Sequence, residues 1–327
     1  MDVAAWCRQA RVLIVAGKGG VGKTTVGAAV ALMAAEAGLE VLVIQLEPQG
    51  GVAGLLGHPE DLGYDEVTLR QPGEGRGGVR ARALTPDGAL LEYLADHGLG
   101  AVSRRLITTG TLDVISTAVP GIRDILVLGK VKQLERAGAA DLVILDAPAT
   151  GHALTFLGSA EGLVDVARVG PIRVQATEVG DLLRDPARCQ VLLVTLPEET
   201  PVNETVETAH RLQDQVGVGV AGVVVNAVYP PLEGLGQDPE EAAAAAGRPL
   251  DPAHAQALSR AAAFRRRRQQ LQGEQVARLT EALELPRLVA PYLFRPGLGA
   301  PQAEELSHAL TREVTALAAP QAAEAGT

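Results

Sequence analysis

The sequence predicts an α/β fold in which a doubly wound, mostly parallel β-sheet is covered by helices on both faces. An apolar run at 11–16, a glycine-rich turn, a helical pattern at 25–37 and a second apolar run at 40–46 form a strand–helix–strand unit. Such a unit implies parallel strands. The later apolar runs do not alternate with polar residues, which is typical of strands buried on both faces. These runs lie at 141–145, 190–196, 220–225 and 287–290.

The segments between these strands indicate one domain, residues 1–327, with an additional helical part. Leucine, isoleucine and valine recur at helical spacing within about 88–135 and again within 154–185, which predicts a helical subdomain inserted on top of the sheet. Residues 57–88 are rich in glycine and charge and predict a loop or a ragged hairpin. The C-terminal part predicts a flexible loop with a short alanine-rich helix at 230–250, helices at 252–284 and 303–318, and a frayed tail at 319–327.

The composition argues against several classes of protein. The chain carries a net charge of −10 and only 2% aromatic residues, so we expect no nucleic-acid partner. Four arginines at 265–268 fall within a predicted helix and would point to all of its faces, which favours solvated, ion-paired side chains. Two cysteines, Cys7 and Cys189, are too few for a disulfide scaffold or a four-cysteine zinc site. We expect both to be buried as small apolar side chains.

Two features of the sequence bear on where the protein works. The N-terminal segment has no basic leader before its apolar run, so a secretory signal is not indicated. The apolar stretches are also shorter than the roughly 20 residues that span a bilayer. We therefore expect a cytoplasmic protein.

The strongest chemical signal is the string GKGGVGKTT at 17–25, which lies between a predicted strand and a predicted helix. It fits the phosphate-binding pattern G-x-x-x-x-G-K-[ST], in which glycines let backbone N–H groups surround phosphates. Lys23 would reach the terminal phosphates, and the hydroxyl of Thr24 would bind Mg²⁺. A glycine-rich turn without a ligand is the alternative. The predicted nucleotide contacts are Gly17, Gly19, Gly20, Val21, Gly22, Lys23, Thr24 and Thr25.

A carboxylate follows the strand at 141–145 directly. An apolar strand that ends in an acidic residue places that group near the Mg²⁺ of a phosphate-binding loop. Asp146 is therefore the second predicted metal ligand and a predicted catalytic residue. The alternative is that Asp146 only forms the turn at the end of the strand.

Two motifs together resemble a known family. GKGGVGKT resembles the deviant Walker A loop of septum-site and partitioning ATPases, nitrogenase iron protein and arsenite-pump ATPases. The string DAPATGH at 146–152 resembles the switch II segment of arsenite-pump and tail-anchored-protein-targeting ATPases. The resemblance implies a P-loop NTPase of the SIMIBI type with ATP and Mg²⁺ as cofactors. It also implies that Lys18 reaches across a dimer to the partner's nucleotide. The alternative is that Lys18 is a solvated lysine of the loop. For His152, packing and a direct role stay open.

Further segments extend the resemblance from about residue 10 to residue 318. VPGI at 119–122 resembles the start of a family helix. The strand end GVVVN resembles the family's adenine loop, which implies that Asn226 reads the base; a turn-forming asparagine is the alternative. APY at 290–292 resembles the second segment on the adenine side and implies contacts from Pro291 and Tyr292.

The chain departs from the family in switch I, which usually reads D-P-A-H. The aligned string here is QLEPQGG at 45–51, so Glu47 stands in place of the aspartate that positions the attacking water. We predict that Glu47 has this catalytic role, although its side chain is one methylene longer than that of aspartate. The alternative is that the Glu47 carboxylate has no catalytic role. This string is nearer to bacterial paralogues that occur in pairs.

The resemblance leaves the biological role open. No C-x-x-C exists, so we expect no zinc, and the thiolate cluster of arsenite sensing is also missing. We predict a Mg²⁺-dependent ATPase that acts as a nucleotide-gated switch in a homodimer or in a heterodimer with a sister ATPase. It would serve targeting or chaperoning of a hydrophobic protein client or a membrane partner. The alternatives are an energising subunit of an anion transporter and a nearly inactive nucleotide-binding switch.

Overall fold

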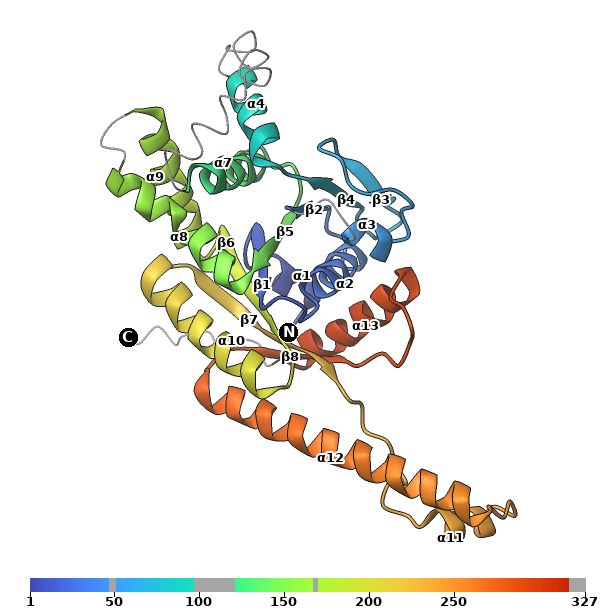
Figure 1. Cartoon of the computed structure of the whole chain (residues 1–327). Helices are drawn as coiled ribbons and strands as arrows, with labels where there is room; N and C mark the ends of the chain where they lie inside the picture. Colours follow the sequence, from blue (N-terminus) through green and yellow to red (C-terminus); the bar gives the residue numbers. More distant parts are fainter. Residues whose placement is uncertain (47–50, 97–120, 167–169, 318–327) are drawn as a thin grey trace, which may run out of the picture.

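The computed structural model describes residues 1–46, 51–96, 121–166 and 170–317. The described residues form an eight-stranded sheet in the order β3-β4-β2-β5-β1-β6-β7-β8 (Figure 1). All neighbouring strands are parallel except the edge pair β3–β4. The predicted α/β class with a doubly wound, mostly parallel sheet is confirmed. The strands are β1 (Val12–Gly17), β2 (Val41–Gln45), β3 (Val67–Arg70), β4 (Val79–Ala83), β5 (Leu142–Ala149), β6 (Cys189–Thr195), β7 (Gly219–Val228) and β8 (Arg287–Pro291).

One face of the sheet is covered by helices from the two ends of the chain. Helix α2 (Lys23–Glu36) is buried over most of its circumference because it lies between the sheet and α13 (Ala300–Ala316). Its small residues, chiefly alanines, allow this close approach. Two short helices, α1 (Val3–Cys7) and α3 (Val52–Leu55), complete the layer.

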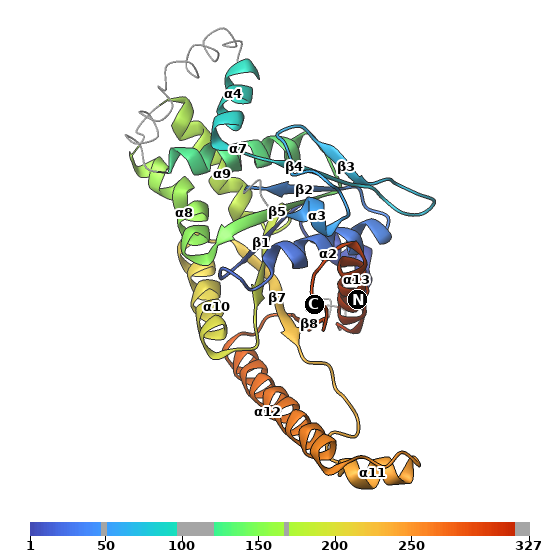
Figure 2. The ribbon, with the colours of Figure 1, turned by 45° about the vertical axis from the view of Figure 1, so that its right-hand side comes forward.

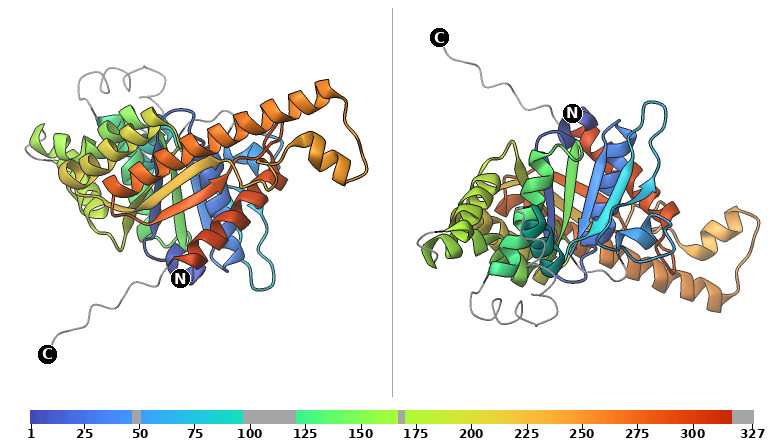
Figure 3. Two further views of the ribbon diagram at one scale, coloured as in Figure 1. Left: turned by 90° about the horizontal axis from the view of Figure 1, so that it is seen from below. Right: turned by 90° about the horizontal axis from the view of Figure 1, so that it is seen from above.

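The opposite face carries the middle of the chain and α12, and Figure 3 shows the sheet between α12 on one face and α13 on the other. One core contains side chains of the sheet, such as Ile14 and Leu145, together with Leu128 and Leu157 of the covering helices. The covering elements are α7 (Ile122–Arg136), α8 (Thr150–Val166), α9 (Pro171–Arg184), α10 (Glu199–Arg211), a π-helical turn (Leu212–Val216) and α12 (Pro252–Ala282). Helix α4 (Pro86–Asp96) packs beside α7. The division into a sheet and a separate helical subdomain stays a prediction.

Residues 57–88 contain more regular structure than a loop. A hairpin is present, as predicted, since β3 and β4 are antiparallel, but β4 also pairs in parallel with β2 and so belongs to the main sheet. Alternate residues of β4 are apolar and buried, and the arginines between them obscure the strand in the sequence. Arg82 is nevertheless buried, because carboxylates lie nearby.

The segment after β7 forms an arm. The short helix α11 (Pro239–Ala245) lies in the predicted loop at 230–250, and α12 follows as one helix of 31 residues. Figures 1 and 2 show α12 running from beside α10 to α11, away from the sheet. The part of α12 nearest the sheet buries Gln272 and Leu279, whereas the part near α11 is mostly exposed.

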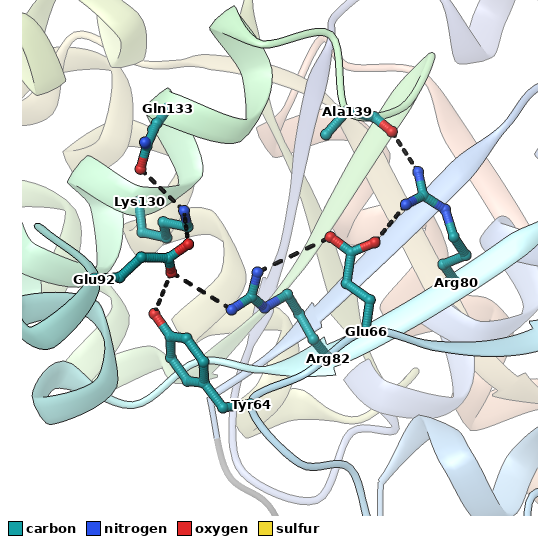
Figure 4. Close-up of polar contacts among 8 residues, drawn as sticks. All are labelled: Tyr64, Glu66, Arg80, Arg82, Glu92, Lys130, Gln133 and Ala139. Carbon is teal, nitrogen blue, oxygen red and sulfur yellow. Dashed lines mark hydrogen bonds and ion pairs between the residues drawn. The ribbon is translucent and has the colours of Figure 1, made fainter. Parts of the chain in front are cut away.

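A network of charges fixes α4 and α7 to the edge of the sheet (Figure 4). At its centre the carboxylate of Glu92 accepts hydrogen bonds from the Tyr64 hydroxyl, at 2.8 Å, and from Lys130 Nζ, at 2.5 Å. The guanidinium of Arg82 lies 3.7 Å from Glu92 and 3.9 Å from Glu66. Because the Lys130 and Arg82 side chains are only 7% and 8% exposed, these ion pairs are little screened by solvent.

These contacts lower two pKa values. Burial alone would raise the pKa of Glu92, but hydrogen bonds from Lys130 and Tyr64 and the nearby positive charges outweigh it, so the pKa lies below the ordinary 4.5. On the other side of α7, a hydrogen bond from Lys132 lowers the pKa of Glu178, a residue of α9. Both carboxylates are therefore ionised in the folded protein at neutral pH.

We predict that these two carboxylates make the fold sensitive to acid. A lowered folded-state pKa contributes stability that is complete above the unfolded value and is lost as the pH falls through the folded value. The free energy of unfolding should therefore decrease below a pH of 4.5, measured by urea unfolding between neutral pH and pH ~3. The double variant Glu92→Gln/Glu178→Gln should be less stable at neutral pH and should show a shallower decrease. An unchanged slope in the double variant would contradict the assignment.

Candidate functional site

The phosphate-binding loop connects the end of β1 to the start of α2. Gly20 and Gly22 have φ values of 83° and 90°, which favour glycine, and Gly22 is the N-cap of α2. Glycine is required at position 17 for a different reason: a Cβ there would lie 2.2 Å from the carbonyl oxygen of Val194 on β6. The loop therefore packs closely against neighbouring backbone and directs the N-terminus of α2, with its positive dipole end, to the sheet's carboxyl edge.

A cavity of ≈ 520 Å³ lies beside this loop. It is formed by the loop, the ends of β6, β7 and β8, and the inner face of α12. Its size falls within the range of small-molecule sites. Seven residues that the sequence predicts as nucleotide contacts line it together: Gly20, Val21, Gly22, Thr25, Asn226, Pro291 and Tyr292.

Asn226 joins the two sides of this cavity. Its Nδ2 donates to the carbonyl oxygen of Val21 at 2.9 Å, and its Oδ1 accepts from the N–H of Ala227 at 2.9 Å. Gly22 is essential to this position, because a Cβ on it would lie 2.4 Å from Asn226 Nδ2. This amide therefore ties the end part of β7 to the phosphate-binding loop.

Next to the cavity, the side-chain oxygens of two predicted metal ligands meet at the start of α2. The hydroxyl of Thr24 donates to Asp146 Oδ2 at 2.6 Å, and Asp146 is buried in register with Val15 of β1 and Gln45 of β2. Asp146 does not follow the strand, as the sequence predicts, but lies within it, because β5 continues to Ala149. Hydroxyl and carboxylate oxygens suit Mg²⁺, which usually also keeps water and phosphate oxygens. Accordingly, the residues described here include no group of three or more His, Cys, Asp or Glu side chains that could hold a metal alone.

The two lysines of the loop have different surroundings. Lys23 Nζ lies 3.4 Å from the carbonyl oxygen of Lys18, across the inside of the loop. Lys18 Nζ instead lies 2.6 Å from Glu204 Oε1 on α10, and the two side chains are 41% and 39% exposed. Exposed ion pairs of this kind are worth only ~0–1 kcal/mol, so Lys18 can leave Glu204 at little cost.

Some predicted residues cannot be placed. Glu47, the first residues of VPGI and the side chain of His152 lie outside the described parts of the structure. The segment that carries Glu47 is nevertheless bounded on both sides. Gln45 Oε1 accepts a hydrogen bond from the N–H of Val52 at 3.0 Å, so the end of β2 and the start of α3 lie together.

Sequence reasoning missed several residues of the cavity. Tyr229, Arg268 and Gln272 line it, and Arg268 forms an ion pair with Glu198, which also lines it. In the sequence, the four arginines at 265–268 were the signal that could have pointed to these residues of α12. These arginines are not equally solvated, since Arg265 and Arg268 are half-buried while Arg266 and Arg267 are exposed.

A second cavity, of ≈ 490 Å³, lies between α4, α7 and α9. Its floor and walls combine apolar side chains, such as Leu126 and Val174, with the charged groups Lys130, Lys132 and Glu178. Val174 is 58% exposed, and nearby Ile172 is 39% exposed. Gly129 permits the approach of α9, because a Cβ on it would lie 2.0 Å from Gln175 Nε2.

Both cysteines are buried, as predicted, and burial raises the pKa of Cys7 and of Cys189 to about 12. They are thiols at neutral pH, and thiols are poor metal ligands. Among the helices that the structure describes, none has the length and apolar character needed to cross a membrane.

Comparison with known proteins agrees with this geometry. The family model described as "CobQ/CobB/MinD/ParA nucleotide binding domain" matches residues 12–250. The chain is 35% identical to ATPase BagA of Mycobacterium tuberculosis over 227 residues, which cover 67% of this chain and 66% of BagA. It is 29% identical to the arsenical pump-driving ATPase of Escherichia coli over 215 residues (65% of this chain, 34% of the relative).

A third relative is ATPase GET3 of Chaetomium globosum, 27% identical over 151 residues, 46% of this chain and 43% of the relative. The chain thus spans just under two thirds of the length of BagA and less than half of the other two. The family model covers most of the chain, including the phosphate-binding loop, Asp146 and Asn226. This chain therefore belongs to the family of CobQ/CobB/MinD/ParA nucleotide-binding domains, and its relatives include arsenical pump-driving and GET3 ATPases.

Proposed function

We propose that this protein is a cytoplasmic, Mg²⁺-dependent ATPase that hydrolyses ATP to ADP and phosphate. One observation carries the proposal: residues from the phosphate-binding loop and both adenine-side segments line a single cavity of ≈ 520 Å³. Besides the loop, the aromatic side chains of Tyr229 and Tyr292 line this cavity. A nucleotide needs both an anion-binding end and an aromatic or apolar end.

The position of each site residue suggests its role in ATP hydrolysis. The N–H groups at the start of α2 and the Nζ of Lys23 would bind the phosphates. Thr24 and Asp146 would hold Mg²⁺, whose positive charge would stabilise the transferred phosphoryl group. Asp146 also begins the segment that resembles switch II, and β5 continues directly into α8, so this segment would couple the metal site to α8. Glu47 orients the attacking water from the segment between β2 and α3.

We further propose that the protein works as a dimeric switch, either with a second copy of itself or with a sister ATPase. The side chain of Lys18 is partly exposed on the loop and forms a surface ion pair with Glu204. On dimerisation the Lys18 side chain would leave Glu204 and neutralise charge at the partner's nucleotide. The relation to arsenical pump-driving and GET3 ATPases supports this arrangement.

We predict that Lys18→Ala lowers ATP hydrolysis about 100-fold or more but changes ATP affinity only a few-fold. The reason is that a cation supplied in trans acts on the transition state, whereas Lys23 and the loop backbone bind the ground state. Hydrolysis should be measured across a series of protein concentrations, with ATP binding measured separately. Lys23→Ala is the inactive reference, and Glu204→Gln, which frees Lys18, should retain hydrolysis.

Two outcomes would redirect this proposal. Unchanged hydrolysis by Lys18→Ala would show that the lysine has no role in trans. ATP binding without turnover at any concentration would instead favour the nearly inactive switch that requires a sister subunit, with Glu47 unable to replace aspartate. Specific activity that rises with concentration and then saturates is the expected result for a homodimer.

The cavity between α4, α7 and α9 supports a role in handling hydrophobic clients. Its lining includes the exposed side chain of Val174 and the apolar side chains of Ala89 and Leu126. An apolar helix could lay one face against these residues while the lysines on the floor remain paired with glutamates. We propose this cavity as the client site.

We predict that a fluorescent peptide of about 20 leucine, isoleucine and valine residues with charged ends binds the protein at this cavity. Val174→Asp should weaken binding about tenfold, because it places a charge against the apolar helix. Leu232→Asp is the matched control, since Leu232 is similarly exposed but lies in the segment before α11. Equal binding by all three proteins would place the client elsewhere.

A further inference from the structure

A buried amide of α12 holds the backbone on the base side of the nucleotide cavity. Gln272 is 2% exposed. Its Nε2 donates to the carbonyl oxygen of Ala227 at 3.1 Å, and its Oε1 accepts from the N–H of Tyr229 at 2.8 Å. One side chain thus satisfies two backbone groups of the segment that follows Asn226.

The backbone between these two bonds has an unusual shape. Ala227 has a φ of 60°, and it is the one non-glycine residue with positive φ in the described ranges. Residues with a side chain adopt this region rarely, and they persist there where surrounding contacts hold them. The contacts here are the Gln272 bonds and the bond from Ala227 N–H to Asn226 Oδ1. This turn brings Asn226 and Tyr229 to the same cavity.

Neighbouring residues of α12 also bond the backbone that follows Asn226. Arg265 and Gln269 both donate to the carbonyl oxygen of Pro230, each at 3.0 Å. These residues lie on one face of the helix with Gln272, because they are separated by four and three positions. The inner face of α12 therefore holds residues 227–230 along their length.

This held segment builds the aromatic end of the cavity. The ring of Tyr229 lies 5.1 Å from that of Tyr292, measured between centroids, and the N–H of Tyr292 donates to the carbonyl oxygen of Val228 at 2.8 Å. The guanidinium of Arg265 lies 4.8 Å from the ring centroid of Phe294, which packs against both tyrosines. Aromatic faces of this kind stack with a purine base.

We propose that Gln272 is the positioning residue for base recognition: it fixes the left-handed turn at Ala227 and so presents Asn226 and Tyr229 to the base. This inference rests on the nucleotide site proposed above. Glutamine suits the task because its amide both donates and accepts, as the two backbone groups require. The phosphate end lies on the other side of Asn226, so Gln272 acts on the base and not on the phosphates.

The test compares two ligands that share the phosphates but not the base. Gln272→Met keeps a similar side-chain shape and removes both hydrogen bonds. We expect it to raise the Kd for Mg²⁺-ATP about tenfold, which is the effect of about 1.4 kcal/mol, and to leave the Kd for Mg²⁺-tripolyphosphate unchanged. Hydrolysis at saturating ATP should also be unchanged, so the loss appears in KM and not in kcat.

Gln270→Met is the matched control. Gln270 lies on the same helix and is exposed, and its side chain bonds only the exposed residues Arg267 and Glu274 among the hydrogen bonds described for it, so both ligands should bind as in the unaltered protein. Gln272→Glu gives a second variant, which retains the acceptor for Tyr229 but loses the donor to Ala227 and should also weaken ATP selectively.

The outcomes separate this inference from the proposed site. Equal loss of ATP and tripolyphosphate binding in both Gln272 variants would mean that the residue only stabilises the fold, and unchanged ATP binding would mean that it has no part in base recognition. Either result would overturn the inference and leave the nucleotide site in place. Failure of the unaltered protein to bind either ligand would overturn the nucleotide site itself.

Discussion

The nucleotide cavity depends on the close contact between Gly22 and Asn226. The absence of a Cβ at Gly22 lets the Asn226 amide reach the carbonyl oxygen of Val21. Gly22 follows β1, and Asn226 lies near the end of β7; these two strands are not neighbours in the sheet, because β6 lies between them. A single side chain therefore spans the end of β6 and sets the distance between the phosphate end and the base end.

The two ends of the cavity are built in different ways. The phosphate end comes from one continuous stretch of chain, in which a strand, a glycine turn and a helix N-terminus follow each other. The base end needs residues of β7, β8 and α12, which come together only when the sheet and its helical layers are complete. Local sequence can specify the first end, but the second depends on tertiary packing.

This difference explains how much the sequence could predict. The strand–loop–helix at 11–37 and the carboxylate at Asp146 follow from patterns within short windows, and the structure places Thr24 against Asp146. Asn226, Pro291 and Tyr292 were reached only through resemblance to a family. Gln272 was not found, because a glutamine in a polar helix gives no signal until the backbone that it bonds is known.

The same reasoning applies to charged residues. Arginines at 265–268 suggested a solvated helix, yet Arg265 and Arg268 contact the rings and carboxylate near the cavity. In β4, Arg82 concealed a strand of the main sheet, because its burial is offset by Glu66 and Glu92, which are distant in the sequence. A sequence shows where a charge is, but only the fold shows whether a partner makes its burial tolerable.

The edges of the sheet limit how copies of this chain can associate. At one edge β3 has four residues and an irregular register with β4, and short, irregular edge strands resist pairing with another strand. At the other edge β8 ends at Pro291, which has no N–H to donate, and the N–H of Val289 already donates to Glu313 Oε2 at 2.9 Å. Both edges therefore disfavour strand addition, so association of two copies through side chains and loops is favoured over joining of two sheets into one continuous sheet.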